Sequence, residues 1–301
     1  MKGADVKLAF LMTAACAVGL SSAWGDGLTD DFVRQARVAY ASGGMTNSLL
    51  DVAPFDVRDG SRHDCPPNGL VRWVSVDCGA NVRDIGGWTG LRTGRVYRGS
   101  ELNCHTNPAE FASWQKTSHG LYLTDSGRRT MSEELGVRTD LDLRSDREIP
   151  TPGRSPIPGA RHMHVACDGY VKYLADTNKA ARIFRVFADS GNYPIYFHCH
   201  GGADRTGTVA FLIEGLCGVS EADLAADFEL TSFSRFGKRR CYDYDEGARH
   251  PRYGSLVTAV KSRPGATLAE KIEDYAIRAC GLRPEEVAAI RRCLVKGERR
   301  K

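Results

Sequence analysis

The chain has 301 residues, of which 42% are hydrophobic and 26% charged, and its formal net charge is +4. This length allows one large domain or two small ones, and the apolar content is sufficient for a substantial core. The mild positive charge argues against the dense basic patches of nucleic-acid-binding proteins, so no nucleic-acid partner is expected.

The first 25 residues have the layout of a secretory signal peptide. Lys2 and Lys7 are basic, and residues 8–20 form an apolar run that is too short to span a bilayer comfortably. Small residues follow this run, as they do before a cleavage site. We therefore predict that residues 1–25 are a signal peptide, that the mature protein is exported to the periplasm or the extracellular space, and that it keeps no stable membrane span. A short buried helix or a single membrane anchor is the alternative interpretation.

Ten cysteines are consistent with export. Cys16 lies in the signal segment, and Thr13 stands where a lipoprotein signal usually has leucine, so a lipid anchor at Cys16 is not expected. Apart from Cys199, which belongs to a motif described below, an even set remains, and in an exported chain such a set predicts disulfides. The alternative is that several of them are buried thiols, Cys217 first. The set consists of Cys65, Cys78, Cys104, Cys167, Cys217, Cys241, Cys280 and Cys293.

Residues 26–77 carry few strong patterns and are predicted to form an N-terminal extension, in which residues 70–76 alternate like a strand. Residues 78–297 are predicted to form a single domain in which strands alternate with helices. This alternation implies an α/β fold with a mostly parallel central sheet flanked by helices. Strands are expected at 96–97, 137–143, 160–165 and 193–199, and helices at 123–136, 178–190 and 206–216.

The C-terminal third is predicted to be helical. Capping residues at their ends indicate three helices, over 221–230, 268–280 and 285–295. Residues 233–253 are basic, aromatic and irregular, which suits a lid over a site for an aromatic phosphate ester. A solvated basic loop is the alternative interpretation, and in either case Cys241 is a candidate to tie the segment down.

The stretch YFHCHGGADRTGTVAFL, residues 196–212, places Cys199 between a buried strand and an apolar helix. A thiol attacks only as a thiolate, and free cysteine is mostly protonated at neutral pH. A loop in this position directs backbone N–H groups inward at the positive end of the following helix, a setting that lowers a cysteine pKa to within about 3.5–7.5. The same ring of N–H groups fits a phosphate dianion.

The residues after Cys199 complete this site. Gly201 and Gly202 let the backbone curl, and Arg205, six residues after the cysteine, is placed for a two-pronged contact with phosphate oxygens. The spacing predicts a catalytic loop that holds a phosphoryl group between a thiolate and a guanidinium, with displacement through a phosphocysteine. The predicted phosphate-binding residues are His200, Gly201, Gly202, Ala203, Asp204, Arg205 and Thr206.

The segment HCHGGADRTG resembles the active-site signature of the cysteine-dependent tyrosine phosphatase superfamily, and Asp204 before Arg205 resembles its bacterial branch of atypical tyrosine and phosphoinositide phosphatases. The resemblance extends roughly over residues 78–295 and implies phosphomonoester hydrolysis. It places phosphotyrosine first as substrate, with phosphoinositides or inositol phosphates as the alternative. Several relatives carry a lysine, associated with phosphoinositide head groups, where this chain has Ala203, and its absence weakens the lipid alternative. Four further segments resemble motifs of that branch: 81–87, 96–102, 142–149 and 218–231.

The leaving oxygen needs a proton donor, and three aspartates are candidates. The resemblance implies an aspartate on a loop well before the cysteine in the sequence, and Asp168 lies 31 residues before Cys199. Its alternative role is to form a turn. Asp204 is the rival donor, with bracing of the loop as its alternative role, and Asp84 is third.

Two further residues are predicted to support the loop. The resemblance implies that the His198 ring bonds backbone carbonyls, while Arg83 either adds charge near the phosphate or pairs with a carboxylate. A metal site at His198, Cys199 and His200 is not expected, because neighbouring residues at a strand end point in opposite directions. Neither a metal nor another cofactor is predicted.

The expected partner is a phosphorylated protein or a small phosphomonoester. Two other classes stay open at this point. One is a phosphate-binding module without turnover, and the other is a sulfurtransferase with a similar cysteine loop.

Overall fold

The computed structural model of the chain describes residues 72–88, 90–103, 123–149, 153–234, 236, 239, 241 and 252–297. The predicted signal peptide and most of the predicted N-terminal extension lie outside the described residues, as does most of segment 233–253. Within the described parts of the chain, no helix is both long and apolar enough to cross a bilayer.

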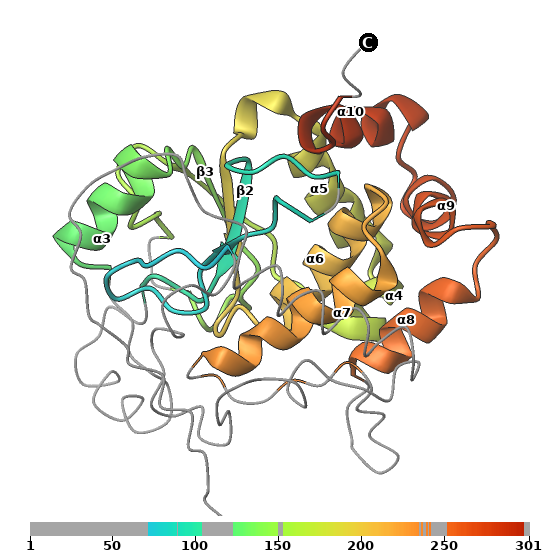
Figure 1. Cartoon of the computed structure of the whole chain (residues 1–301), viewed down its shortest axis with the longest axis horizontal. Helices are drawn as coiled ribbons and strands as arrows, with labels where there is room; N and C mark the ends of the chain where they lie inside the picture. The colour runs from blue at the N-terminus through green and yellow to red at the C-terminus, as the bar shows by residue number, and fades with distance from the viewer. Residues whose placement is uncertain are drawn as a thin grey trace, which may run out of the picture.

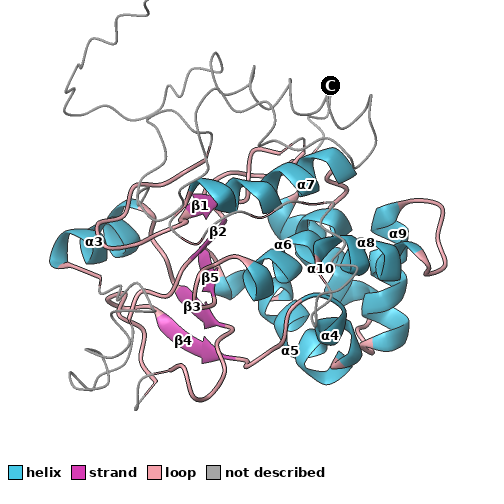
Figure 2. Cartoon of the chain, turned by 90° about the horizontal axis from the view of Figure 1, so that it is seen from below, coloured by secondary structure: helices cyan, strands magenta, loops and turns pink. Residues whose placement is uncertain are grey.

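The described strands form one five-stranded sheet in the order β1-β2-β5-β3-β4, of which Figure 1 labels β2 and β3 and Figure 2 labels all five. Strand β1 is antiparallel to β2, and all other neighbouring strands are parallel. The α/β fold with a mostly parallel sheet is therefore confirmed, and β5 lies at the centre with its carboxyl end beside those of β2 and β3. The bounds are β1 Arg83–Asp84, β2 Val96–Gly99, β3 Thr139–Asp142, β4 Arg161–His164 and β5 Ile195–His198.

The two faces of the sheet carry cores of different size, because successive side chains of a strand point to opposite faces. In β5, Ile195 and Phe197 join the larger core, while Tyr196 joins the smaller one. Figure 2 shows the corresponding layers, with most helices gathered on one side and α3, Asp125–Arg129, on the other. On the larger side lie α4 Tyr170–Ala175, α5 Thr177–Ala188, α6 Asp204–Leu216, α7 Glu221–Leu230, α8 Tyr253–Lys261, α9 Leu268–Asp274 and α10 Pro284–Leu294.

Capping or first-turn residues begin helices α3, α7, α9 and α10. The Thr124 hydroxyl accepts the N–H of Gly127 at 3.1 Å at the start of α3. Ser220 caps α7, Thr267 forms a capping box with Glu270 at α9, and Pro284 occupies the first turn of α10. Two helices continue as π-helical turns, α3 Asp125–Arg129 into Thr130–Glu134 and α9 into Tyr275–Ala279.

Some elements differ from the prediction. No strand forms over the described part of 70–76; Trp73 makes only an isolated bridge with Arg83. The helices α4 and α8 were not predicted. Helix α4 has six residues, too few to show a helical period in the sequence. Helix α8 begins at Tyr253, where the basic, irregular segment of the sequence ends. Two short 3-10 turns, Ser190–Asn192 and Thr231–Phe233, complete the described elements.

The cysteines correct one expectation. All seven cysteines that the structure describes are free thiols, so no disulfide joins any two of them. Besides Cys199, four of these thiols lie in the hydrophobic core, where they pack as small apolar side chains. Cys217, expected to be the first buried thiol, is only half-buried, and Cys65 and Cys104 lie outside the described residues. The four core thiols are Cys167, Cys241, Cys280 and Cys293.

Candidate active site

The loop from Cys199 to Ala203 connects the central strand β5 to helix α6 at the carboxyl edge of the sheet. Cys199 is only 3% exposed. The loop is pressed against the end of β2 at Gly202, whose φ is +66°. A Cβ at this position would lie 2.3 Å from the carbonyl carbon and oxygen of Gly99, so only glycine fits there.

Two side chains hold the loop carbonyls from behind. Asn81 Nδ2 donates to the carbonyl oxygen of Gly201 at 3.0 Å, and Arg98 Nη2 donates to that of Gly202 at 2.8 Å. The C=O and N–H groups of a peptide point in opposite directions. Carbonyls turned back toward Asn81 and Arg98 therefore leave the adjoining N–H groups directed to the open side, as a phosphate cup requires.

Asp227 of α7 anchors this support. Its Oδ1 accepts a hydrogen bond from Arg83 Nε at 3.0 Å, its carbonyl accepts one from Arg83 Nη2 at 2.8 Å, and its Oδ2 pairs with Arg98 Nη1. Burial acts to raise the pKa of Asp227, but the two guanidiniums lower it below its usual range. Arg83, for which two roles were open, thus pairs with a buried carboxylate behind the loop, and neither Asn81, Arg98 nor Asp227 was singled out in the sequence.

The surroundings of Cys199 favour a thiolate. Burial acts to raise the pKa of Cys199, but Arg205 and the hydroxyl and N–H of Thr206 outweigh it, so that the pKa lies below the ordinary value of a thiol. His198 braces the same residue from the strand. Its Nδ1 lies 3.2 Å from the carbonyl oxygen of Cys199, and its Nε2 lies 3.0 Å from Asp140 Oδ1.

Glu148 holds the guanidinium of Arg205. Arg205 Nη1 and Nη2 donate to the two carboxylate oxygens of Glu148 at 2.6 and 2.8 Å. Burial acts to raise the pKa of Glu148, but Arg205 and Ser145 lower it to about 2. Sequence reasoning did not select Glu148, although it belongs to the segment 142–149 that resembled a family motif.

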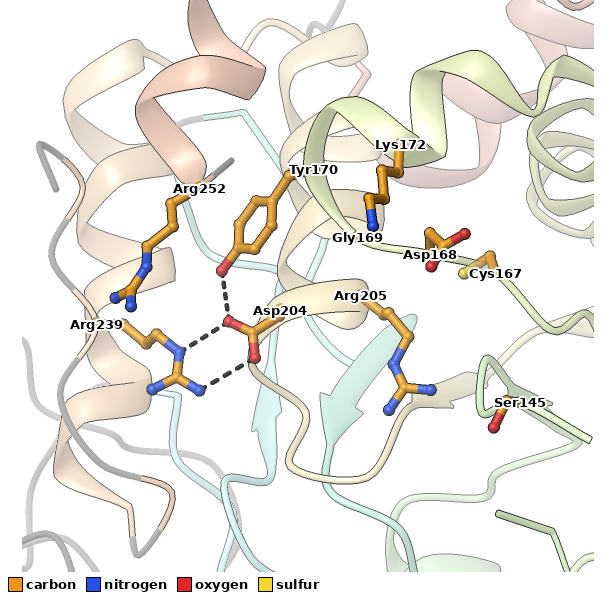
Figure 3. Close-up of a pocket in the computed structure, with 10 residues that line it drawn as sticks. All are labelled: Ser145, Cys167, Asp168, Gly169, Tyr170, Lys172, Asp204, Arg205, Arg239 and Arg252. Carbon is orange, nitrogen blue, oxygen red and sulfur yellow. Dashed lines mark hydrogen bonds and ion pairs between the residues drawn. The ribbon is translucent and has the colours of Figure 1, made fainter. Parts of the chain in front are cut away.

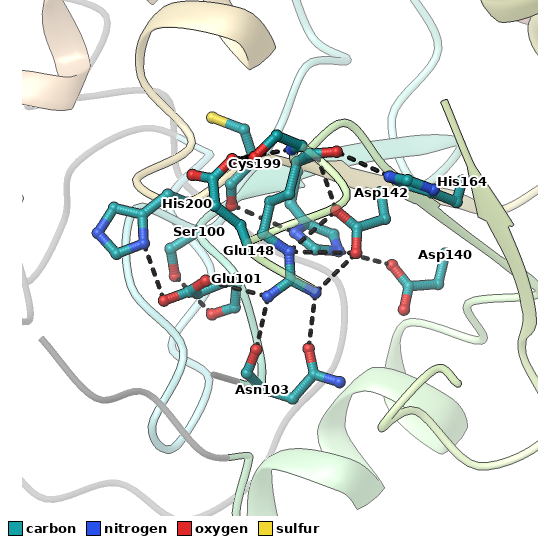
Figure 4. A network of polar contacts seen from close by, with 12 residues as sticks. Ser100, Glu101, Asn103, Asp140, Asp142, Glu148, His164, Cys199 and His200 are labelled. Atoms are coloured by element: carbon teal, nitrogen blue, oxygen red, sulfur yellow. Dashed lines mark hydrogen bonds and ion pairs between the residues drawn. The ribbon is translucent and has the colours of Figure 1, made fainter. Parts of the chain in front are cut away.

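A second polar network, centred on Arg144, lies beside the loop at His200 (Figure 4). Arg144 Nη1 donates to Glu101 Oε2 at 3.0 Å, and Arg144 Nε donates to Asp142 Oδ1 at 3.0 Å. Glu101 Oε1 lies 2.9 Å from His200 Nδ1. Burial acts to lower the pKa of His200, but Glu101 raises it above its ordinary value. His200 thus stands half-buried at the loop, held there by the Glu101 carboxylate.

A cavity of about 680 Å³ adjoins the loop at Asp204 and Arg205 (Figure 3). The segment between β4 and α4 forms one wall: a Cβ on Gly169 would lie 3.5 Å from the backbone nitrogen of Arg205. Asp168 is an exposed residue on this wall. The cavity is lined by Ser145, residues 167–170, Lys172, Asp204, Arg205, Arg239 and Arg252.

The three candidate proton donors differ in their contacts. Asp204 is engaged: its oxygens accept hydrogen bonds from Arg239 Nε at 2.8 Å and Nη2 at 3.1 Å, and Oδ1 also accepts one from the Tyr170 hydroxyl. Burial acts to raise the pKa of Asp204, but Arg239 outweighs burial, so that the pKa of Asp204 lies below its ordinary value. The carboxylate of Asp84 accepts the N–H groups of Gly86 at 2.7 Å and Gly94 at 2.6 Å and so closes its own loop.

The described part of segment 233–253 contacts the catalytic loop. Besides the Arg239 clamp on Asp204, the Phe236 ring packs against Gly201, where an added Cβ would lie 2.9 Å from the ring. Cys241, the expected tether, is buried as a free thiol, and its N–H donates to Glu229 Oε1 at 2.8 Å. That the segment forms a lid over the site stays a prediction.

The described side chains form no group of three histidine, cysteine or carboxylate residues with the spacing of a metal site.

Comparisons with known proteins identify the family of the chain. The model of the tyrosine phosphatase family matches residues 74–296. A protein of Nostoc commune named tyrosine-protein phosphatase is 28% identical over 151 residues, which cover 42% of this chain and 50% of that protein, so the chain spans about half the length of this curated relative.

Two solved structures are also similar. One is the core catalytic domain of the PP-IP phosphatase SIW14 from S. cerevisiae, solved in complex with citrate, at 16% identity with a TM-score of 0.37, covering 68% of this chain and 91% of that one. Another structure of the Siw14 catalytic core matches at 16% identity with a TM-score of 0.35, covering 54% of this chain and 80% of that one.

Proposed function

We propose that this chain, which belongs to the tyrosine phosphatase family, hydrolyses phosphomonoesters through a phosphocysteine intermediate on Cys199. One observation carries the proposal: a buried cysteine with a lowered pKa stands at the start of a loop whose arginine is held in place by Glu148. A thiolate nucleophile, inward N–H groups and a fixed guanidinium are the parts that phosphoryl transfer to sulfur needs.

The reaction has two steps. In the first, the Cys199 thiolate attacks phosphorus, the bond from phosphorus to the ester oxygen breaks, and that oxygen takes a proton from a general acid. In the second, water attacks the phosphocysteine, the same residue accepts the proton of the water, and phosphate leaves with the thiolate restored. In both steps the loop N–H groups and Arg205 stabilise the charge that develops on the phosphoryl oxygens.

Cys199→Ser is the decisive variant. It should abolish hydrolysis of para-nitrophenyl phosphate while orthophosphate still binds, because the cup and Arg205 remain. The assay is run in the presence of a chelator, with thiosulfate as a second substrate for the sulfurtransferase alternative. Hydrolysis by the serine variant at the parent rate would contradict the mechanism, and a parent chain that binds phosphate without turnover would be a binding module.

We further propose that Asp168 is the general acid. It is exposed on the wall of the cavity, whereas the Asp204 carboxylate is paired with Arg239 and hydrogen-bonded to Tyr170. Asp168→Asn should lower kcat for a substrate with a poor leaving group by about 10²–10⁴-fold, the usual contribution of such a residue. Para-nitrophenyl phosphate, whose leaving group needs little protonation, should lose less. If Asp204→Asn shows this leaving-group dependence and Asp168→Asn does not, the roles are reversed.

The substrate class is a separate question. The name of the Nostoc relative supports phosphotyrosine, the substrate placed first by the sequence. The basic side chains that line the cavity support the alternative, a substrate with more than one phosphate.

We also propose that the protein is exported, on the layout of residues 1–25. Amino-terminal sequencing of the mature protein from the extracellular or periplasmic fraction would show cleavage within or just after this segment. An intact amino terminus in the cell extract would contradict export.

A further inference from the structure

The segment that carries Asp168 is fastened to helix α6 through Tyr170. The Tyr170 N–H donates to Thr208 Oγ1 at 2.7 Å, and the Thr208 hydroxyl donates to the carbonyl oxygen of Asp204 at 2.9 Å. Thr208 is fully buried, so its hydroxyl bridges the two backbones away from bulk water. Along the chain, this bridge lies two residues after Asp168.

The bridge takes the place of a helix cap. Tyr170 is the first residue of α4, and the first N–H groups of a helix have no acceptor within that helix. Gly169, which precedes it, has no side chain that could accept one. The Thr208 hydroxyl of α6 accepts the Tyr170 N–H instead, so the start of α4 is completed where it meets α6.

Helix α6 presents this anchor on the same face as Arg205. Arg205 and Thr208 are three residues apart, a spacing that places two side chains next to each other on a helix. A Cβ on Gly169 would lie 3.5 Å from the backbone nitrogen of Arg205, which is van der Waals contact. One helix therefore holds both the phosphate-binding guanidinium and the segment that carries the proposed acid.

The backbone of Tyr170 is strained at this point. Its φ is +57°, in the left-handed region that a residue with a bulky side chain rarely occupies. Such a conformation persists only where the surrounding structure imposes it. Without the bridge, we expect the strain to be released and residues 167–169 to shift away from α6.

The side chain of Tyr170 is held as firmly as its backbone. Its hydroxyl donates to the Asp204 carboxylate, which Arg239 also binds (Figure 3). Its ring packs edge-on against Phe228 of α7, with 6.3 Å between the centroids. The hydroxyl of Tyr170 and, through Thr208, its N–H are thus both tied to Asp204, at the carboxylate and at the carbonyl.

We infer that Thr208 and Tyr170 are positioning residues for the general acid. They hold residues 167–169 against the start of α6 and so keep Asp168 at the cavity beside Arg205 while the leaving oxygen is protonated. A proton donor must lie within hydrogen-bond reach of the atom it protonates, so a displaced segment slows this transfer. The inference rests on the proposed function, because it takes Asp168 to be the acid.

Thr208→Val tests the bridge, because it keeps the shape of the side chain and removes the hydroxyl. We measure kcat/KM of the full chain, which reports the steps up to the phosphocysteine, for phenyl phosphate and for para-nitrophenyl phosphate. Phenyl phosphate, whose leaving oxygen depends more on protonation, should lose about tenfold, the cost of one hydrogen bond. Para-nitrophenyl phosphate should lose less, and Thr208→Ser, which keeps the hydroxyl, should recover the greater part of the loss.

A double-mutant cycle separates positioning from a general loss of structure. If Thr208 acts through Asp168, then Thr208→Val should add nothing to the loss caused by Asp168→Asn. A further loss of the same size in the Asp168→Asn background would show that Thr208 supports only the fold. Equal losses with the two substrates would show the same, and either result would overturn the inference.

Thr258→Val is the matched control. Thr258 Oγ1 donates to the carbonyl oxygen of Gly254 at 2.9 Å within α8, the same kind of bond that Thr208 makes within α6, but Thr258 is exposed. Both substrates should keep the parent kcat/KM in this variant. If Thr258→Val reproduces the effect of Thr208→Val, the bridge to Tyr170 is not the cause and the inference is wrong.

Tyr170→Phe is the second variant, and thermal unfolding checks the fold of each. It removes the hydrogen bond to Asp204 and keeps the N–H, so it carries the test if Thr208→Val does not fold. It should show the same dependence on the leaving group and on Asp168. Equal losses of kcat/KM with the two substrates in Tyr170→Phe would count against a positioning role.

Hydrogen exchange supplies a readout that does not depend on the acid. In Thr208→Val the amides of residues 167–175 should exchange faster, because the Tyr170 N–H has lost its acceptor. Unchanged exchange there would overturn the inference. If exchange rises but Asp168→Asn shows no leaving-group dependence, the bridge holds and the assignment of Asp168 as acid fails. If Asp168→Asn shows that dependence and Thr208→Val does not, the inference alone fails.

Discussion

The two sides of the catalytic loop are both built from arginine–carboxylate pairs, but they differ in exposure. Behind the loop, the side chains of Arg83 and Arg98 are fully buried and that of Asp227 is 3% exposed. On the cavity side, Arg205 and Glu148 are each 21% exposed. Removing one partner of a buried pair leaves an uncompensated charge in the protein interior, whereas water screens and replaces a partner near the surface.

This difference indicates a division of labour. Arg98 of the buried pairs holds the backbone carbonyl of Gly202, and Arg83 donates to Asn81, which holds that of Gly201, so that these contacts fix the shape of the cup. The pair of Arg205 with Glu148 holds a guanidinium that must also bind phosphate, and its partial exposure leaves room for a substrate oxygen to join it. One side of the loop is therefore expected to determine stability, and the other to determine binding and turnover.

The largest effect is expected behind the loop. Asp227→Asn keeps the volume but leaves two buried guanidiniums without a carboxylate, so the free energy of unfolding should fall by about 3–5 kcal/mol. Urea unfolding followed by circular dichroism measures this. Asp274→Asn, which removes the carboxylate paired with Arg263 and Arg278 nearer the surface, should cost about 1 kcal/mol or less. Equal losses in the two variants would show that burial of the pair behind the loop does not raise the cost of losing its carboxylate.

A smaller effect is expected on the cavity side. Glu148→Gln should lower kcat/KM for para-nitrophenyl phosphate by about tenfold, because Arg205 loses its charged partner and with it a fixed orientation. Steady-state kinetics with Glu133→Gln, a substitution on the α3 side of the molecule, as control measures the loss. An unchanged kcat/KM in Glu148→Gln would show that Arg205 needs no partner.

The same pair also predicts a dependence of stability on pH. The folded-state pKa of Glu148 is lowered from 4.5 to about 2, so the pair stabilises the folded protein above pH 4.5 and this contribution is lost as the pH falls toward 2. The difference in unfolding free energy between the parent chain and Glu148→Gln should therefore shrink over that interval.

The smallest effect concerns Cys199, which both sides of the loop influence. Because Arg205 and Thr206 hold its pKa below the ordinary value of 9.0, alkylation by iodoacetamide should reach half of its maximal rate at a lower pH than in N-acetylcysteine. Cys199→Ser identifies which labelling phase belongs to this thiol. A midpoint at or above that of the free thiol would mean that burial outweighs the cations around the sulfur.

Local sequence was sufficient for most of the elements and for the centre of the site. The strand, glycine turn and apolar helix of 196–212 are adjacent in the chain, so their order alone places Cys199 and Arg205 at a helix start. Capping residues such as Thr124 and Thr267 act within one helical turn, and for this reason they marked true helix ends. Short α4, with little more than one turn, carried too weak a period to be recognised.

Only the tertiary structure decided which distant residues support the site. Arg83 and Asp227 are 144 residues apart, and Arg205 and Glu148 are 57 apart, so no local pattern links them. The sequence also did not indicate that Asp204 pairs with Arg239, a contact that favours Asp168 as the general acid. Nor did it indicate that the described cysteines are free thiols. Sequence periodicity reports which face of an element is buried, whereas charge pairing depends on distances between elements that only the packed fold sets.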